Sequence, residues 1–122
     1  MNQKNRILVV DDNRSFRKGM RVLLDIQPDM KVVGEAATGQ KALEMTEKLR
    51  PDLVLLDVQM PGMNGVELTR QIKLRWPQTK IILMTMYPEY DGKAIEVGAD
   101  AFLTKGIPPD LVLVVIRGII KN

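Results

Sequence analysis

The pattern of apolar and polar residues alternates between two periodicities along the chain. Short apolar runs predict buried strands, and each run is followed by a stretch in which apolar residues recur at helical spacing. The predicted strands span residues 6–10, 31–37, 52–57, 80–86 and 101–105. The predicted helices span residues 15–27, 38–50, 64–76, 89–97 and 109–120. Five successive βα units result.

This alternation predicts the fold class. Near-continuous runs of Val, Ile and Leu are typical of parallel strands that are covered on both faces, and helical crossovers join such strands. We therefore predict a single α/β domain over residues 1–122, a doubly wound five-stranded parallel sheet with helices on both faces. Ligands of such sheets bind beside the carboxyl ends of the strands.

Polar residues stand at those carboxyl ends. The predicted strands end in Asp11 and Asp12, in Asp57, in Thr85 and in Lys105. If the strands lie side by side, these side chains converge on one pocket. Three carboxylates in a small space repel one another and raise one another's pKa unless a cation lies among them. Oxygen ligands suit a hard divalent ion, which is Mg²⁺, Mn²⁺ or Ca²⁺.

Composition narrows the choice of chemistry. The chain has 122 residues, of which 45% are hydrophobic and 27% charged, as expected of one globular domain. It contains no cysteine and no histidine, which excludes disulfides, thiolate metal sites and a histidine base. A net charge of +3 is too small to indicate nucleic-acid binding by the whole chain. The sequence shows neither a membrane-spanning run nor a signal peptide, so we expect a cytoplasmic protein.

Four segments in order, VVDDN, LLDVQMPGMNG, MTM and GADAFLTKG, resemble the receiver domain of two-component response regulators. The resemblance covers essentially the whole chain and implies a flavodoxin-like sheet with strand order 2-1-3-4-5. It also implies a phosphorylation switch and not an ordinary enzyme. A sensor histidine kinase would supply the phosphoryl group, and self-dephosphorylation would be slow.

The resemblance assigns roles to the acidic residues. Asp57 would be the nucleophile that becomes an aspartyl phosphate. Asp12 and Asp57, with the backbone carbonyl of Gln59, would hold Mg²⁺, and Asp11 would complete the site directly or through water. Taken alone, Asp12 is more typical of a helix N-cap than of a catalytic residue, and only together with Asp57 and Lys105 does it indicate the acidic site.

The resemblance also assigns a response to phosphorylation. Lys105 would bind the phosphoryl oxygens, Thr85 would move to hydrogen-bond one of them, and Phe102 would turn inward as a switch. Without the resemblance, Thr85 and Phe102 read as ordinary buried residues.

The turn after the third predicted strand explains why the chain changes direction so sharply there. Pro61 fixes φ, Gly62 and Gly65 allow turn geometries that a Cβ opposes, and Asn64 can cap the next helix.

Several residues depart from the family pattern. Gly106 follows Lys105 where proline is common, so no cis peptide bond is expected there. Met86 is bulky where a small residue is usual. Gln59 and Tyr87 occupy positions that tune phosphoryl loss in the family, and shielding by Tyr87 predicts slow loss.

Two surfaces suggest partners. Arg14, Arg17, Lys18 and Arg21 share one side of the first predicted helix, where they form either a solvated face or a docking site for the kinase.

The last predicted helix is apolar nearly all round. Leu111, Val112, Val115 and Ile116 can face the sheet, whereas Leu113, Val114, Ile119 and Ile120 point elsewhere. The resemblance makes the surface of the fourth helix, fifth strand and fifth helix a dimerisation or output contact. The alternative is deeper burial of the helix.

Two other functions use similar residues. A Mg²⁺-dependent phosphatase of the haloacid-dehalogenase type carries a D-x-D motif after its first strand, where this chain has Asp11, Asp12 and Asn13. A flavodoxin-like flavin carrier is disfavoured because two carboxylates would repel the flavin phosphate.

The chain resembles receivers that precede a helix-turn-helix region, which this sequence does not contain, and a free-standing receiver is the close alternative. We therefore expect DNA binding only through such an output region, with control of transcription.

Overall fold

The computed structural model describes residues 3–87 and 96–121. The strands are β1 (Asn5–Val10), β2 (Met30–Ala36), β3 (Leu53–Asp57), β4 (Lys80–Thr85) and β5 (Ala101–Thr104). The helices are α1 (Arg14–Asp25), α2 (Gly39–Leu49), α3 (Gly65–Arg75) and α5 (Pro109–Ile120). These elements confirm nine of the predicted ones, with ends shifted by at most two residues. The helix predicted over 89–97 falls mostly on residues 88–95, which lie outside the described residues.

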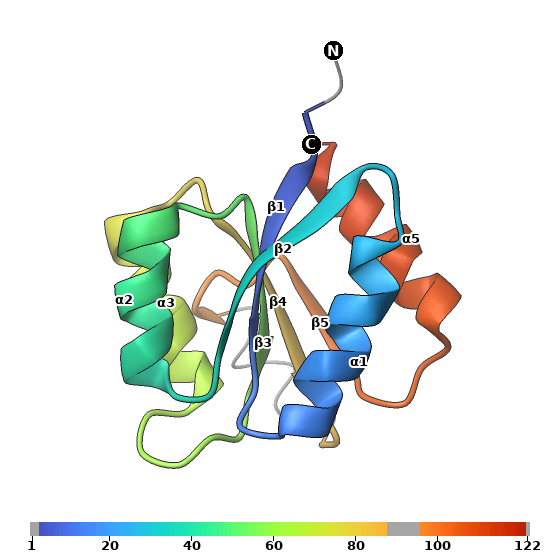
Figure 1. The fold of residues 1–122 in the computed structure, drawn as a ribbon. Helices are drawn as coiled ribbons and strands as arrows, with labels where there is room; N and C mark the ends of the chain where they lie inside the picture. Colours follow the sequence, from blue (N-terminus) through green and yellow to red (C-terminus); the bar gives the residue numbers. More distant parts are fainter. Residues whose placement is uncertain (1–2, 88–95, 122) are drawn as a thin grey trace.

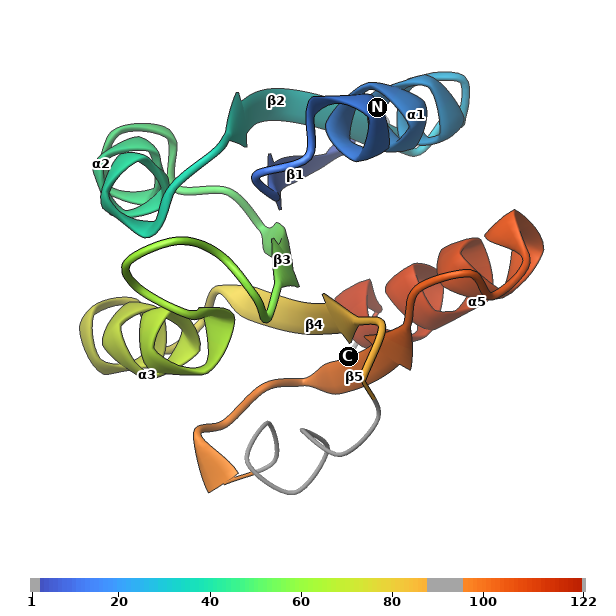
Figure 2. The ribbon, with the colours of Figure 1, turned by 90° about the horizontal axis from the view of Figure 1, so that it is seen from below.

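All strand pairs of the sheet are parallel, in the order β2-β1-β3-β4-β5. The predicted fold class and strand order are therefore confirmed. Helices α2 and α3 cover one face, and α1 and α5 cover the other (Figures 1 and 2). No helix of the described ranges is long and apolar enough to cross a membrane.

Each face of the sheet has its own hydrophobic core because successive side chains of a strand point to opposite faces. In β1, Leu8 and Val10 belong to the core under α2 and α3, whereas Ile7 and Val9 belong to the core under α1 and α5. All four are at most 1% exposed. Close packing on both faces holds the strands firmly, so the residues at their carboxyl ends have well-defined positions.

The starts of α1, α2 and α3 are capped by side chains that the sequence only partly identified. The side chains of Asn13, Thr38 and Asn64 accept backbone N–H groups of α1, α2 and α3. Asn64 is thus a cap, as predicted. The N-cap interpretation of Asp12 is wrong, because the neighbouring Asn13 takes that position and accepts the N–H of Phe16 at 2.9 Å.

The apolar character of α5 is mostly explained by burial. Val112 and Ile116 are buried, and Leu113, Val115, Ile119 and Ile120 pack partly against the same core. The prediction for Leu111 was wrong, because this residue is 50% exposed. The neighbouring Val112, in the same turn, is only 3% exposed, so the first turn of α5 faces the core through Val112 and leaves Leu111 toward solvent. Only Leu111 and Val114 are exposed large apolar residues in the described α5.

Candidate functional site

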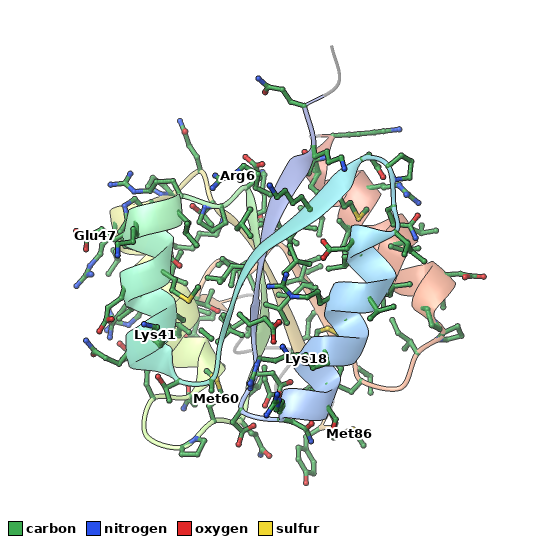
Figure 3. All side chains as sticks on the ribbon, in the orientation of Figure 1. Arg6, Lys18, Lys41, Glu47, Met60 and Met86 are labelled. Atoms are coloured by element: carbon green, nitrogen blue, oxygen red, sulfur yellow. The ribbon has the colours of Figure 1, made fainter. Side chains whose placement is uncertain are left out.

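The carboxyl ends of β1, β3, β4 and β5 border a cleft of about 610 Å³. Six predicted site residues line it, namely Asp11, Asp12, Asp57, Gln59, Thr85 and Lys105. Met60 and Met86 lie at the same end of the sheet, the lower end in Figure 3. Phe102 is not among the lining residues; it packs, partly buried, against the core under α2 and α3. The sequence therefore identified the cleft, and Phe102 stays a predicted switch beside it.

Three carboxylates meet in this cleft, as predicted. One oxygen atom each from Asp11, Asp12 and Asp57 lies within 4.8 Å of the other two. Asp11 and Asp57 are only 1% and 7% exposed, whereas Asp12 is open to solvent. A cluster of oxygen donors that remains open on one side fits a hard divalent cation with water ligands, and Mg²⁺ is such a cation.

Lys105 partly neutralises the cluster. Its Nζ lies 2.6 Å from Asp11 Oδ2 and 3.3 Å from Asp57 Oδ1. Its backbone N–H donates to the carbonyl of Thr85 at 2.7 Å, which fixes the chain where it leaves β5. Burial by itself would lower the pKa of Lys105, but the two carboxylates outweigh it and raise that pKa. The side chain is therefore an ammonium at neutral pH.

Phe16 contacts Lys105, and the sequence analysis did not predict this contact. Its ring centroid lies 4.4 Å from the Lys105 ammonium, within the range of a cation–π interaction. Its position in the first turn of α1 gave no signal for this role, because the contact depends on how α1 packs on the sheet and on where Lys105 reaches.

The surroundings of Asp57 disfavour the charged form of its carboxyl group. Burial raises its pKa most, and the nearby Asp11 raises it further. Lys105 and the backbone N–H of Gln59 act in the opposite direction without cancelling the rise. Any additional positive charge that enters the cleft would therefore stabilise the charged form of Asp57.

The turn after β3 depends on two glycines for different reasons. Gly62 has φ +84°, a left-handed conformation that favours glycine, as the sequence suggested. Gly65 is required for another reason: its backbone lies so close to the backbone of residues 57–58 that no side chain fits between them. A Cβ there would overlap the carbonyl oxygen of Asp57 and lie 2.8 Å from Val58 Cα. The start of α3 therefore rests directly on the segment that carries Asp57.

The segment after β4 forms one wall of the cleft. Thr85 is buried, and its hydroxyl accepts the backbone N–H of Tyr87 at 3.0 Å. Met86 and Tyr87 line the cleft and are 63% and 45% exposed. Across the cleft, the peptide bond before Gly106 is trans, and Gly106 has φ +94°.

The basic side of α1 is not simply solvated. Arg17, Lys18 and Arg21 all form ion pairs with Glu35 of β2, at 3.2, 3.4 and 2.7 Å. Arg17 is only 14% exposed, so the interpretation as a solvated face is wrong for this residue. The sequence analysis missed Glu35, because its role depends on how α1 lies against β2.

The fold and the acidic cleft indicate the class of this protein, and comparison with known protein families identifies that class. The model of the response regulator receiver domain matches residues 7–117, and this chain belongs to that family.

The curated proteins to which the chain is similar include a transcriptional regulatory protein and an enzyme. The chain is 32% identical over 116 residues to the transcriptional regulatory protein DegU of Brevibacillus brevis, covering 93% of this chain and 49% of DegU. It is 41% identical over 107 residues to a protein-glutamate methylesterase/protein-glutamine glutaminase of Alkalilimnicola ehrlichii, covering 84% of this chain and 27% of that protein. These matches do not support the haloacid-dehalogenase alternative.

A solved structure shows the same fold. The crystal structure of a LuxR-family two-component response regulator from Aurantimonas sp. SI85-9A1 superposes with a TM-score of 0.92 and is 33% identical. The match covers 98% of this chain and 86% of the other. The chain spans about half the length of the first curated relatives that it matches.

Proposed function

We propose that Asp57 is the phosphoacceptor of this receiver domain. A carboxylate oxygen of Asp57 attacks the phosphorus of a phosphohistidine on a sensor histidine kinase. The new O–P bond forms as the P–N bond breaks, and the histidine leaves with the electron pair and takes up a proton. One observation carries this assignment: the Asp57 carboxylate ends β3 in an open cleft, 3.3 Å from the ammonium of Lys105.

The other cleft residues support phosphoryl transfer by neutralising and orienting charge. This reaction needs little covalent help from a protein, so positioning and electrostatics supply most of the catalysis. Asp11, Asp12 and Asp57, with the carbonyl of Gln59, would hold Mg²⁺. The bound ion would neutralise charge on the phosphoryl oxygens. Lys105 can pair with a phosphoryl oxygen while it keeps its contact with Asp11.

Thr85 and Phe102 would convert the modification into a change of shape. The Thr85 hydroxyl now accepts the N–H of Tyr87, and it retains its hydrogen as a donor for a phosphoryl oxygen. Movement of Thr85 toward Asp57 would release space on the β5 side, into which Phe102 would turn. Met86 and Tyr87 at the rim would slow the attack of water on the acyl phosphate.

The output surface would consist of α5, β5 and the segment 89–97. Leu111 and Val114 expose apolar area on α5, and β5 is an edge strand. Phosphorylation would favour a homodimer or an effector contact there. In a cytoplasmic regulator of transcription, DNA would be bound by a helix-turn-helix region outside this chain.

Light scattering with and without acetyl phosphate tests the proposed dimer. Val114→Glu should weaken that dimer.

Intact mass spectrometry after incubation with Mg²⁺ and acetyl phosphate tests the proposed function. We expect the parent chain to gain the mass of one phosphoryl group and to lose it with hydroxylamine, which cleaves acyl phosphates. Asp57→Asn should show no gain, and neither should the parent with excess EDTA. An equal gain in Asp57→Asn would contradict the proposal. Rapid release of phosphate from varied phosphoesters would indicate a phosphatase instead.

A further inference from the structure

Among the three carboxylates of the acidic site, that of Asp12 is the one least held by neighbouring groups. Its side chain is exposed, unlike those of Asp11 and Asp57. Within residues 3–87 and 96–121, no hydrogen bond or ion pair holds its carboxylate. Even so, an oxygen of Asp12 lies within 4.8 Å of the other two carboxylates. The backbone must therefore set the position of this side chain.

The peptide that joins Asp11 to Asp12 is held from the side of α1. The guanidinium Nη1 of Arg17 donates a hydrogen bond of 2.7 Å to the carbonyl oxygen of Asp11. On the other side, the N–H of Asp11 donates to the carbonyl of Ala36 at 3.0 Å. The Asp11 carbonyl belongs to the same rigid peptide plane as the nitrogen of Asp12. A bond to that carbonyl fixes the direction in which the chain enters Asp12.

Glu35 in turn holds Arg17. The Nε of Arg17 donates to Glu35 Oε1 at 3.2 Å, and Glu35 is only 12% exposed. Two edges of one planar guanidinium thus bind two acceptors, a carboxylate on β2 and a carbonyl after β1. A planar fork can bridge two acceptors in fixed directions, whereas an ammonium is a point charge on a flexible stem.

We infer that Arg17 is a positioning residue of the acidic site: anchored by Glu35, it fixes the Asp11–Asp12 peptide and so places the Asp12 carboxylate for cation binding. The inference deepens the proposed function and rests on it. Groups that orient metal ligands typically change metal affinity by about 10- to 100-fold when they are removed.

Arg21 provides a matched control for charge. It also binds Glu35, through Nε at 2.7 Å, and it lies one turn further along α1. In the described part of the chain it makes no contact with Asp11. Loss of either arginine removes one positive charge from the same carboxylate, and only loss of Arg17 releases the Asp11 carbonyl.

Three possible roles of Arg17 predict different changes in cation affinity when the residue is removed. If Arg17 acted only as a positive charge near an acidic cleft, its removal would strengthen cation binding, because a repulsion would be lost. If it acts by positioning Asp12, its removal weakens cation binding. A merely structural role would lower the melting temperature and leave the affinity of the folded protein unchanged.

Isothermal titration of Mg²⁺ into the full chain separates these roles. Each variant is first shown by circular dichroism to be folded at the temperature of the titration. We expect Arg17→Gln to raise the Mg²⁺ dissociation constant by about tenfold. Arg21→Gln should change it by less than about twofold, or lower it slightly. Arg17→Lys, which keeps the charge and loses the fork, should resemble Arg17→Gln.

Unchanged or tighter Mg²⁺ binding by folded Arg17→Gln would overturn the inference, as would full retention of affinity by Arg17→Lys. Equal weakening by Arg21→Gln would also overturn it, because charge or helix stability would then explain the effect. The titration involves no phosphoryl transfer. Its failure is therefore distinguishable from the failure of Asp57 to form an acyl phosphate.

Discussion

The ammonium of Lys105 lies 2.6 Å from a carboxylate oxygen of Asp11, although 94 positions separate the two residues in sequence. Lys105 follows β5 and Asp11 follows β1, and β3 and β4 lie between these strands in the sheet. The lysine therefore reaches across the carboxyl ends of two strands, and it passes Asp57 on the way. One positive charge is shared between two buried carboxylates, which leaves the cleft with excess negative charge.

Asp57→Asn is expected to stabilise the chain in the absence of Mg²⁺. The pKa of Asp57 is raised above its usual value of 3.8 by burial and by Asp11. A raised carboxyl pKa means that the folded state binds the proton more tightly than the unfolded state. The resulting penalty is absent below pH 3.8, grows as the pH rises above it and is complete above the folded pKa.

The expected gain is on the order of 1 kcal/mol, the size of an interaction between two partly screened charges. It would raise the melting temperature by roughly 4 °C at pH 7 in EDTA. Glu47→Gln, which removes an exposed carboxylate on α2, is the control and should have almost no effect. A lower melting temperature for Asp57→Asn in EDTA would show that Asp57 is not under electrostatic strain.

Gly65→Ala is expected to destabilise the fold by about 1–3 kcal/mol, the usual cost of forcing extra atoms into a packed site. The new Cβ would overlap the backbone of Asp57 and Val58, which cannot move without displacing β3. Gly19→Ala is the matched control, because α1 offers open space at Gly19 and alanine favours a helix by about 0.5–1 kcal/mol. Urea unfolding should show opposite shifts for the two variants, and shifts of the same sign would contradict the packing at Gly65.

The cluster around Glu35 is expected to make stability depend on pH in the acidic range. Burial alone would raise the pKa of Glu35, but Arg21, Lys18 and Arg17 outweigh it and lower that pKa below 4.5. For a lowered pKa, the stabilisation is fully present above pH 4.5 and is lost as the pH falls through the folded pKa. Urea midpoints of the parent should therefore fall more steeply below pH 4.5 than those of Glu35→Gln. Parallel curves for the two proteins would show that the ion pairs contribute nothing.

Tyr87→Ala and Met86→Ala are each expected to shorten the lifetime of the phosphorylated state severalfold. Both side chains line the cleft at its solvent-exposed rim, where they restrict the approach of water to Asp57. The loss of the phosphoryl mass with time, after removal of acetyl phosphate, measures this lifetime. Leu74→Ala, which truncates an exposed side chain of α3 outside the cleft lining, should leave it unchanged. Lifetimes equal to that of the parent would show that these side chains do not shield the site.

The sequence predicted the residues of the cleft because their positions depend only on strand order. Asp11, Asp57, Thr85 and Lys105 each follow an apolar run, and parallel strands bring such ends together. The contacts of Phe16 and Glu35 could not be predicted in the same way. They depend on the rotation of α1 about its axis and on its distance from the sheet. Periodicity identifies the buried stripe of a helix and does not show which side chain reaches a neighbouring strand.

Leu111 and Gly65 show a second limit. Helical spacing placed Leu111 on the same stripe as Val115, but α5 turns Val112 and Ile116 toward the core and leaves Leu111 exposed. Gly65 was correctly singled out for the wrong reason, because its helix start packs against the backbone of residues 57–58. In both cases the deciding factor is how one element is oriented and placed against another, which no local pattern contains.

The most direct test of phosphorylation at Asp57 is to locate the modified residue. The chain is treated with acetyl phosphate and Mg²⁺, reduced at once with borohydride, digested, and sequenced by tandem mass spectrometry. Borohydride converts an aspartyl phosphate to homoserine, so we expect homoserine at position 57 and aspartate at positions 11 and 12. Homoserine at Asp11 or Asp12, with Asp57 unmodified, would contradict the assignment.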